Sequence, residues 1–274
     1  KNAESFSLTG LVSLDKNAYF TDVIISRNSP EAMTRIPLPA IHIDHSVYVA
    51  NERNYYHFVT EDLVNAVLLS KSLDFKIVCP GNIRWKEGLF KTFLPQIELL
   101  QVPLVCNIRG PEILALTKEN HDSYIHPESI HLLSELFAKH RPQNALPTEL
   151  LYISRRHAAS RSPINEEAVE LFLEARGFRC IHSESLSIEE QIELFSKAAV
   201  VIAPHGAGLT NMLAMREGGA IIELFTPTHM NFCYWSMARK LGLTYYYLMQ
   251  QQTDRGSEID IEALAETLAL LRVS

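Results

Sequence analysis

The chain contains 274 residues, which is enough to bury one large core or two of ordinary size. Apolar residues make up 47% of it and charged residues 21%, a balance typical of a globular enzyme and not of a disordered chain. The net charge of −7 argues against nucleic acid as the main ligand, because a polyanion requires a dense Lys and Arg surface. Any phosphate group must therefore be bound by local groups.

Four cysteines lie far apart and form no Cys-x-x-Cys pair. Their apolar surroundings favour reduced core thiols over a disulfide or a metal site. No apolar run approaches the roughly 18 residues of a membrane span. The expected location is the cytoplasm, with peripheral attachment to a bacterial membrane left open, or the secretory-pathway lumen in a eukaryote. Because the chain begins at Lys1, a preceding anchor or domain is also left open.

Residues 1 to about 50 show short apolar fragments broken by prolines, which predict strands and turns. From residue 54 the pattern changes to helices and strands in alternation. The predicted elements are helix 54–71, strand 75–79, helix 85–93, strand 102–106 and helix 127–139. Residues 140–147 are polar and bounded by prolines, as in an interdomain linker.

The second half alternates more clearly. Ser162 is predicted to cap a helix that has Pro163 at its first position, and Ser187 with Glu190 forms a capping box. The predicted elements are strand 150–153, a helix to 177, strand 178–181, a helix from 187, strand 199–203, a helix after a glycine loop, strand 220–225, helix 230–241, strand 244–248 and a helix from 257.

This alternation predicts the fold class. Strands separated by helices need crossover connections, so we expect an α/β protein with mainly parallel sheets. Two domains are predicted, residues 1–145 with an irregular lead-in over 1–50, and residues 146–274. Ligands of such sheets bind at the carboxyl ends of the strands.

A glycine loop follows the predicted strand 199–203. Glycines at this position let the backbone turn sharply and approach a ligand, and the next helix would direct free N–H groups at the same place. The loop has neither the third glycine of a dinucleotide fingerprint nor the Gly-Lys-Ser/Thr ending of a P-loop. We therefore predict an anion site suited to a diphosphate, with a tight turn without ligand as the alternative. Its residues are His205, Gly206, Ala207, Gly208, Leu209, Thr210 and Asn211.

Three further residues are candidates for the same site. Arg155 ends a strand and Arg161 follows it, so both could direct a guanidinium group at phosphate oxygens; a solvated basic loop is the alternative. Glu223 ends the next strand and could accept the hydroxyls of a ribose, with an ion-paired glutamate as the alternative. Tyr234 and Trp235 could stack on a base, but a core position is favoured.

The helix predicted from residue 54 has a polar face. Asn54, His57, Glu61 and Asn65 are three or four residues apart and share this face. A carboxylate one turn from an imidazole fixes its tautomer and raises its basicity, so His57 and Glu61 are predicted as a general base and its partner. The alternative is an exposed polar stripe.

No metal site is expected. The chain has no Asp-x-Asp motif, which metal-dependent nucleotide-sugar enzymes use to hold a divalent ion against the diphosphate. Its 11 histidines include no His-Glu-x-x-His or comparable spacing.

The ordered set of motifs resembles glycosyltransferase family 61, also called the capsular-polysaccharide-biosynthesis-like family. The resemblance covers roughly residues 50 to 250, and its most specific part is the His-Gly-Ala-Gly-Leu-Thr-Asn run from His205. It implies a GT-B architecture, in which two Rossmann-like domains face across a cleft, and inverting, usually metal-independent transfer from a UDP-sugar. It places Arg155, residues 206–211 and Glu223 with the donor, and the helix from Asn54 to Glu61 on the acceptor side.

The predicted function is therefore sugar transfer from a UDP-sugar to a hydroxyl group of a glycan or polysaccharide. No cofactor is expected besides the donor substrate, and no nucleic acid partner. Two alternatives stay open: a GT-B module that binds a nucleotide or glycan without transfer, and a nucleotide-sugar epimerase.

Overall fold

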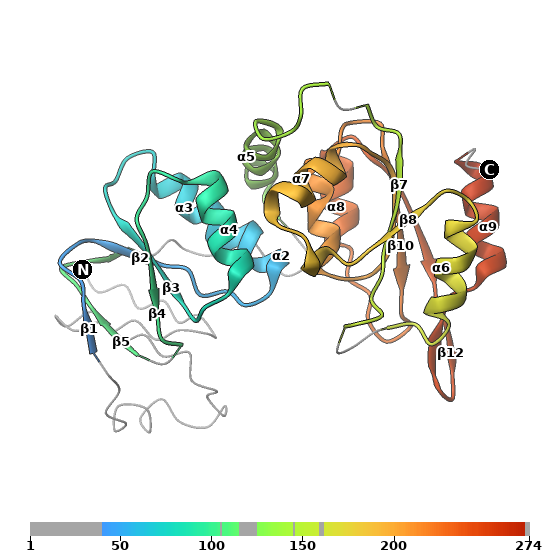
Figure 1. Ribbon diagram of the computed structural model, residues 1–274, viewed down its shortest axis with the longest axis horizontal. Helices are drawn as coiled ribbons and strands as arrows, with labels where there is room; N and C mark the ends of the chain where they lie inside the picture. The colour runs from blue at the N-terminus through green and yellow to red at the C-terminus, as the bar shows by residue number, and fades with distance from the viewer. Residues whose placement is uncertain (1–39, 105, 115–124, 145, 159–161, 272–274) are drawn as a thin grey trace. The chain divides into compact units, whose positions relative to one another are not determined.

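The computed structural model describes residues 40–104, 106–114, 125–144, 146–158 and 162–271. The lead-in before residue 40 and Arg161 lie outside these residues. The chain divides into two compact units, residues 1–119 and 120–274, and each is described by itself (Figure 1).

The first unit is built on a parallel four-stranded sheet in the order β4-β3-β2-β6. A separate parallel pair joins β1 to β5. Buried side chains such as Val47, Val78 and Ile108 form the core. The strands are β1 (Ala40–His42), β2 (Val47–Val49), β3 (Lys76–Pro80), β4 (Leu99–Val102), β5 (Asn107–Arg109) and β6 (Ile113–Leu114), and the helices are α2 (Tyr55–His57), the π-helix η1 (Phe58–Leu63), α3 (Val64–Leu69) and α4 (Arg84–Phe93).

One strand prediction in this unit is wrong. The run over 102–106 is not one strand, because β4 ends at Val102 and β5 begins only at Asn107. Pro103 accounts for the break, since proline has no backbone N–H to donate to a neighbouring strand.

The predicted helix from residue 54 is present but contains a π-helical turn. Asn54 caps it, and its Oδ1 accepts a hydrogen bond of 2.9 Å from the backbone N of Tyr56. The π-helix η1 then buries Phe58, Val59 and Leu63. A π-helix hydrogen-bonds i to i+5, so it rotates every later side chain relative to a regular α-helix.

The second unit contains a five-stranded sheet in the order β11-β10-β9-β7-β8, in which all pairs are parallel. Figure 1 shows α6 and α9 on one face of this sheet and α7 and α8 on the other. The α/β fold class with mainly parallel sheets is therefore confirmed. The elements are α5 (Pro127–Ala138), β7 (Glu149–Ile153), α6 (Glu166–Glu174), β8 (Arg179–Ile181), η2 (Ser183–Ser185), α7 (Ile188–Ser196), β9 (Ala198–Pro204), η3 (Ala207–Ala214), β10 (Ala220–Phe225), α8 (Cys233–Lys240), β11 (Thr244–Met249), β12 (Gln251–Thr253), β13 (Gly256–Glu258) and α9 (Ile261–Leu270).

Two helix starts in this unit are predicted from capping residues, and one of the two predictions is confirmed. The capping box of Ser187 and Glu190 is formed at the start of α7, as predicted. Ser162 does not cap α6, which begins at Glu166 after Asn165. The Ser162 hydroxyl instead donates to the backbone O of Arg155 at 2.6 Å, so it stabilises the loop after β7.

Helix α5 belongs to the second unit, although the boundary predicted from the sequence falls after residue 145. Its buried face, with Ile130, Leu133 and Phe137, packs against α8 and η3. The segment predicted as a linker is also attached to this unit, because Arg141 donates to the backbone O of Leu213 at 2.8 Å.

Two smaller predictions concern membrane spans and cysteines. Within the described residues, none of the helices has the length and apolar content to cross a membrane. None of the four cysteines forms a disulfide; Cys79, Cys106 and Cys233 are buried, as predicted, whereas Cys180 is only partly buried.

Candidate functional site

Polar residues follow every strand of the second sheet at its carboxyl edge. Because the strands are parallel, the residues after them lie along one edge, where α/β sheets bind their ligands. Several of these side chains are buried and have an oxygen without a hydrogen-bond partner among the described residues. The residues after the strands are Ser154 and Arg155 (β7), Ser183 (β8), His205 and Gly206 (β9), Thr226 (β10) and Gln250 (β11), and the unpartnered oxygens belong to Ser183, Thr226 and Gln250.

The glycine turn packs against the end of β7. A Cβ atom placed on Gly206 would collide with Nη1 of Arg155, so the guanidinium group lies directly on this glycine. A Cβ on Gly208 would lie 3.2 Å from Cγ2 of Ile153, in the same strand end. The structure thus brings Arg155 and the glycine turn together, and the absence of a Cβ atom at both glycines permits this close packing.

The backbone of Arg155 is fixed by Glu166. The backbone N–H of Arg155 donates to Oε1 of Glu166 at 2.6 Å. The same oxygen accepts a hydrogen bond of 3.0 Å from the hydroxyl of Tyr152. Glu166 is buried, and reasoning from sequence missed it, because an acid in the first turn of a helix ordinarily serves the helix dipole.

The helix after the glycine turn differs from the expectation. η3 is a 3₁₀-helix, in which N–H groups bond three residues back, and its first N–H groups have no acceptor within the helix. Thr210 and Asn211 are 0% and 2% exposed, so both side chains point into the unit. Nδ2 of Asn211 donates to Oε1 of Gln191 at 2.6 Å. These two residues anchor the turn on α7 and the core, and His205 is the polar side chain of the run that stays at the edge.

Glu223 connects two strands through its carboxylate. It lies inside β10, not at its end, and is fully buried. Its Oε1 pairs with Nδ1 of His205, and its Oε2 accepts a hydrogen bond from the hydroxyl of Tyr245 in β11. Burial raises the pKa of Glu223, and the hydrogen bonds from His205 and Tyr245 offset part of this rise. Both oxygens that were expected to meet a ribose are therefore occupied by groups of the chain.

Aromatic rings lead from His205 to the surface. The imidazole stacks on buried Phe225 with ring centroids 5.4 Å apart, and Phe225 in turn contacts Phe232 and Tyr247. Phe232 and Tyr247 are 42% and 51% exposed. Of the two residues considered for stacking, Tyr234 is a core residue, as favoured.

Trp235 is not a core residue. It is 43% exposed, and the guanidinium carbon of Arg239 lies 5.4 Å from its ring centroid. An aromatic side chain in α8 therefore stays available at the surface.

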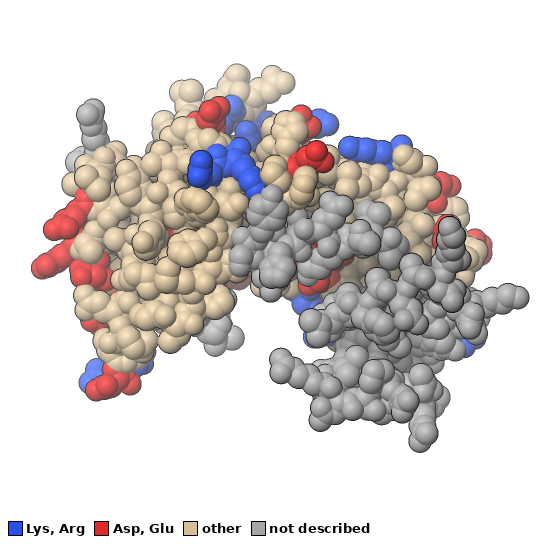
Figure 2. Space-filling view, turned by 180° about the vertical axis from the view of Figure 1, so that it is seen from behind, with Lys and Arg blue, Asp and Glu red and all other residues tan. Residues whose placement is uncertain are grey.

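The surface of the second unit has little charge in the view of Figure 2. Acidic side chains gather at the end of this unit where α6 and α9 lie, and a broad face beside them shows no charged side chains. No extended basic field is visible on this face.

In the first unit, His57 and Glu61 form a hydrogen-bonded pair. Nδ1 of His57 lies 2.8 Å from Oε1 of Glu61, and the side chains are 26% and 11% exposed. Asn54, the third candidate on this face, serves as the helix cap. Asn65 does not share the face, because the π-helix rotates it inward, where it donates to the Tyr48 hydroxyl at 3.3 Å.

Asp62 is a buried carboxyl group that reasoning from sequence missed. Its Oδ1 accepts a hydrogen bond of 2.6 Å from the Tyr48 hydroxyl, and its Oδ2 accepts one of 2.8 Å from the backbone N of Glu52. Burial raises the pKa of Asp62 to about 7, although these two hydrogen bonds oppose the rise. Asp62 therefore fixes the loop after β2 to the helix that carries His57.

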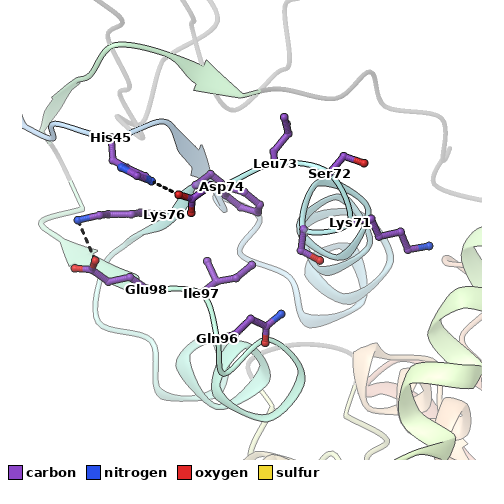
Figure 3. A pocket seen from close by; sticks show the side chains of 11 residues that line it. His45, Lys71, Ser72, Leu73, Asp74, Lys76, Gln96, Ile97 and Glu98 are labelled. Carbon is purple, nitrogen blue, oxygen red and sulfur yellow. Dashed lines mark ion pairs between the residues drawn. The ribbon is translucent and has the colours of Figure 1, made fainter.

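Two cavities open at opposite edges of the first sheet. One cavity, of about 560 Å³, lies at the amino ends of strands β2 to β4 (Figure 3). It contains the ion pairs His45–Asp74 and Lys76–Glu98. The other cavity, of about 710 Å³, lies at the carboxyl ends of the same strands, which is the edge where parallel sheets bind ligands. It is lined by Arg53, Gly81, Asn82, Ile83, Gln101, Val102, Pro103 and Leu104.

These features define the class, an α/β protein with mainly parallel sheets and a glycine turn at a carboxyl edge, which is consistent with a Rossmann-like fold. The chain belongs to glycosyltransferase family 61: the Glycosyltransferase 61 family matches residues 31–222, which is more than half of it. The match contains the His57 helix, Arg155 and the glycine turn, and it ends one residue before Glu223.

A relative of the chain is known in an insect. The chain is 31% identical over 99 residues to the EGF domain-specific O-linked N-acetylglucosamine transferase of Drosophila melanogaster. The aligned part is 35% of this chain and 19% of the relative, so it spans less than a fifth of the relative's length.

Proposed function

We propose that this protein transfers a sugar from a UDP-sugar to a hydroxyl group of a glycan, with inversion at the anomeric carbon and without a metal ion. In this proposal the two units form the two domains of a GT-B enzyme. The second unit binds the donor and the first binds the acceptor.

The observation that carries the donor assignment is the contact between Arg155 and Gly206. The contact puts the guanidinium group of Arg155 beside a turn at the carboxyl edge of a parallel sheet. The first backbone N–H groups of η3, which follows this turn, have no acceptor within the helix. Such a site can bind a diphosphate and compensate the charge that develops as it leaves.

The first unit offers a base and a binding cavity. In the pair of His57 and Glu61 the carboxylate orients the imidazole, as a general base requires. Arg53, which lines the cavity of about 710 Å³, directly precedes the helix cap Asn54. We propose that an acceptor bound in this cavity gives its proton to His57.

The name of the insect relative supports two extensions. It suggests N-acetylglucosamine as the sugar and a protein hydroxyl group, in an EGF domain, as a second kind of acceptor. UDP-N-acetylglucosamine is accordingly the first donor to test.

A thermal-shift screen with UDP, UDP-N-acetylglucosamine and other nucleotides tests the donor site. A ligand at about 100 times its Kd adds roughly 2.7 kcal/mol of stability, so UDP should raise Tm by several degrees. Gly206→Ala should abolish the shift, because the added methyl group displaces the guanidinium group of Arg155, and Arg155→Lys should reduce it.

Arg156→Lys is the matched control, because Arg156 pairs with Glu170 outside the turn. It should keep the full shift. The donor proposal fails when no uridine nucleotide shifts Tm. Binding of UDP without transfer to any acceptor would favour a non-catalytic module, and product formed from the donor alone would favour an epimerase.

A further inference from the structure

The carboxylate of Glu223 orients His205 from inside the sheet. Nδ1 of His205 is engaged by Oε1 of Glu223, and the other oxygen of the same carboxylate is engaged by Tyr245. This leaves Nε2 for a ligand, and among the described residues Nε2 has no hydrogen-bond partner. The His205 side chain is 9% exposed, so it is rigidly packed but still reaches the edge of the sheet.

The other groups around this imidazole cannot replace Glu223. Phe225 of β10 stacks on the ring, Tyr234 of α8 lies at 5.4 Å between centroids, and His229 of the loop after β10 lies at 5.0 Å. The guanidinium group of Arg155 lies on the next residue, Gly206. Among these neighbours Glu223 is the one carboxylate, and it alone can compensate a positive charge on His205.

We propose that His205 is a catalytic residue that donates a hydrogen bond from Nε2 to the departing phosphate, and that Glu223 and Tyr245 are positioning residues that hold the imidazole in the required orientation. This inference rests on the proposed sugar transfer. It replaces the ribose contact expected for Glu223 and gives Tyr245 a role that the sequence did not suggest.

The step is balanced without an additional reactant. The bond between the anomeric carbon and the phosphate oxygen breaks, and its electron pair stays on the phosphate. The acceptor oxygen forms the new bond and gives its proton to a base. The N–H group at Nε2 of His205 donates a hydrogen bond to the phosphate oxygen and stabilises the new negative charge.

The test is UDP binding to the full chain by calorimetry at pH 7.5, with uridine as the ligand that lacks phosphates. Glu223→Gln should weaken UDP binding about tenfold, because the charged hydrogen-bond partner of His205 is removed. Tyr245→Phe should weaken it about threefold, because Glu223 loses its second hydrogen bond. Uridine affinity should stay unchanged in both.

Tyr246→Phe is the control, because the next residue of β11 faces the other side of the sheet. It should bind UDP like the wild type. Equal UDP affinity in wild type, Glu223→Gln and Tyr245→Phe would overturn the inference and leave the proposed function intact. A wild type that binds no UDP would instead overturn the proposed function. If Glu223→Gln unfolds, Tyr245→Phe, which keeps the ring packing, decides the outcome.

Discussion

Asp62 carries an ionisable carboxyl group into the interior of the first unit. Its pKa in the folded protein is about 7, whereas an aspartate in an unfolded chain has a pKa of about 3.9. The folded state therefore binds the proton more tightly than the unfolded state. This contribution to stability is fully present below about pH 4 and is lost as the pH rises through about 7.

Asp62→Asn should remove this pH dependence, because the amide keeps the shape of the side chain and cannot ionise. Between pH 5 and 8, the free energy of unfolding of the wild type should fall by about 1 to 4 kcal/mol relative to the variant. Urea unfolding followed by tryptophan fluorescence measures this difference. Asp74→Asn, at an exposed position, is the control, and parallel curves for wild type and Asp62→Asn would contradict the prediction.

At the scale of single residues, the sequence predicts which side chains could take part in catalysis or binding. It does not predict which other side chains they contact. The spacing of His57 and Glu61 is enough to predict that they meet, because both lie in one helix. Glu223 was predicted at a strand end, yet its partners come from the loop after β9 and from β11. Contacts between strands depend on register, which a single sequence does not specify.

The π-helix η1 is the element that sets the geometry of the candidate base. It keeps His57 and Glu61 together while it rotates Asp62 and Asn65 toward Tyr48. π-helical turns occur frequently at functional sites. Helical periodicity could not predict this, because the hydrophobic pattern of a mixed helix still fits a period of 3.6.

His57→Ala and Glu61→Gln should each lower kcat of sugar transfer by about 10² to 10⁴, as expected for loss of a general base or its partner. The donor KM should change little, because neither residue is assigned to the donor. The chain supplies a matched control in α5, where His131 and Glu135 form an exposed pair with the same spacing at 3.2 Å. His131→Ala and Glu135→Gln should keep full activity. Wild-type rates in the His57 and Glu61 variants would remove the assignment.

Helices and strands were predicted well where the capping residues and the hydrophobic periodicity agreed. They were predicted poorly where the conformation of a turn depends on tertiary packing. The alternation of strands and helices in the second unit, including the capping box at Ser187, was readable from the sequence. The 3₁₀ form of η3 was not, because Thr210 and Asn211 look like polar turn residues and prove to be buried anchors.

For the whole molecule, a net charge of −7 means that the proposed donor diphosphate would bind against the overall charge. We expect sugar transfer to continue in EDTA, because the chain has no Asp-x-Asp motif and Arg155 and the turn amides supply local positive charge. Product formation in excess EDTA, with and without added Mn²⁺, measures this. Loss of activity in EDTA and its recovery with Mn²⁺ would decide against a metal-independent reaction.

The sequence predicted the fold class and most of its larger elements, whereas the boundary predicted after residue 145 differs from the division into compact units, which falls after residue 119. A proline-bounded polar stretch at residues 140–147 resembles a linker, and the buried face of α5 can be assigned to a unit only when its partners are known. Those partners, η3 and α8, lie far along the chain.

The packing of α5 on α8 has a consequence for synthesis on the ribosome. The sequence of α5 ends at Ala138, but that of α8 begins only at Cys233. The apolar face of α5 is therefore synthesised well before the helix on which it packs. At translation rates of about 5–20 residues per second this interval is on the order of ten seconds. During that time we expect Ile130, Leu133 and Phe137, which are buried in the folded chain, to be exposed as apolar surface that a chaperone can bind.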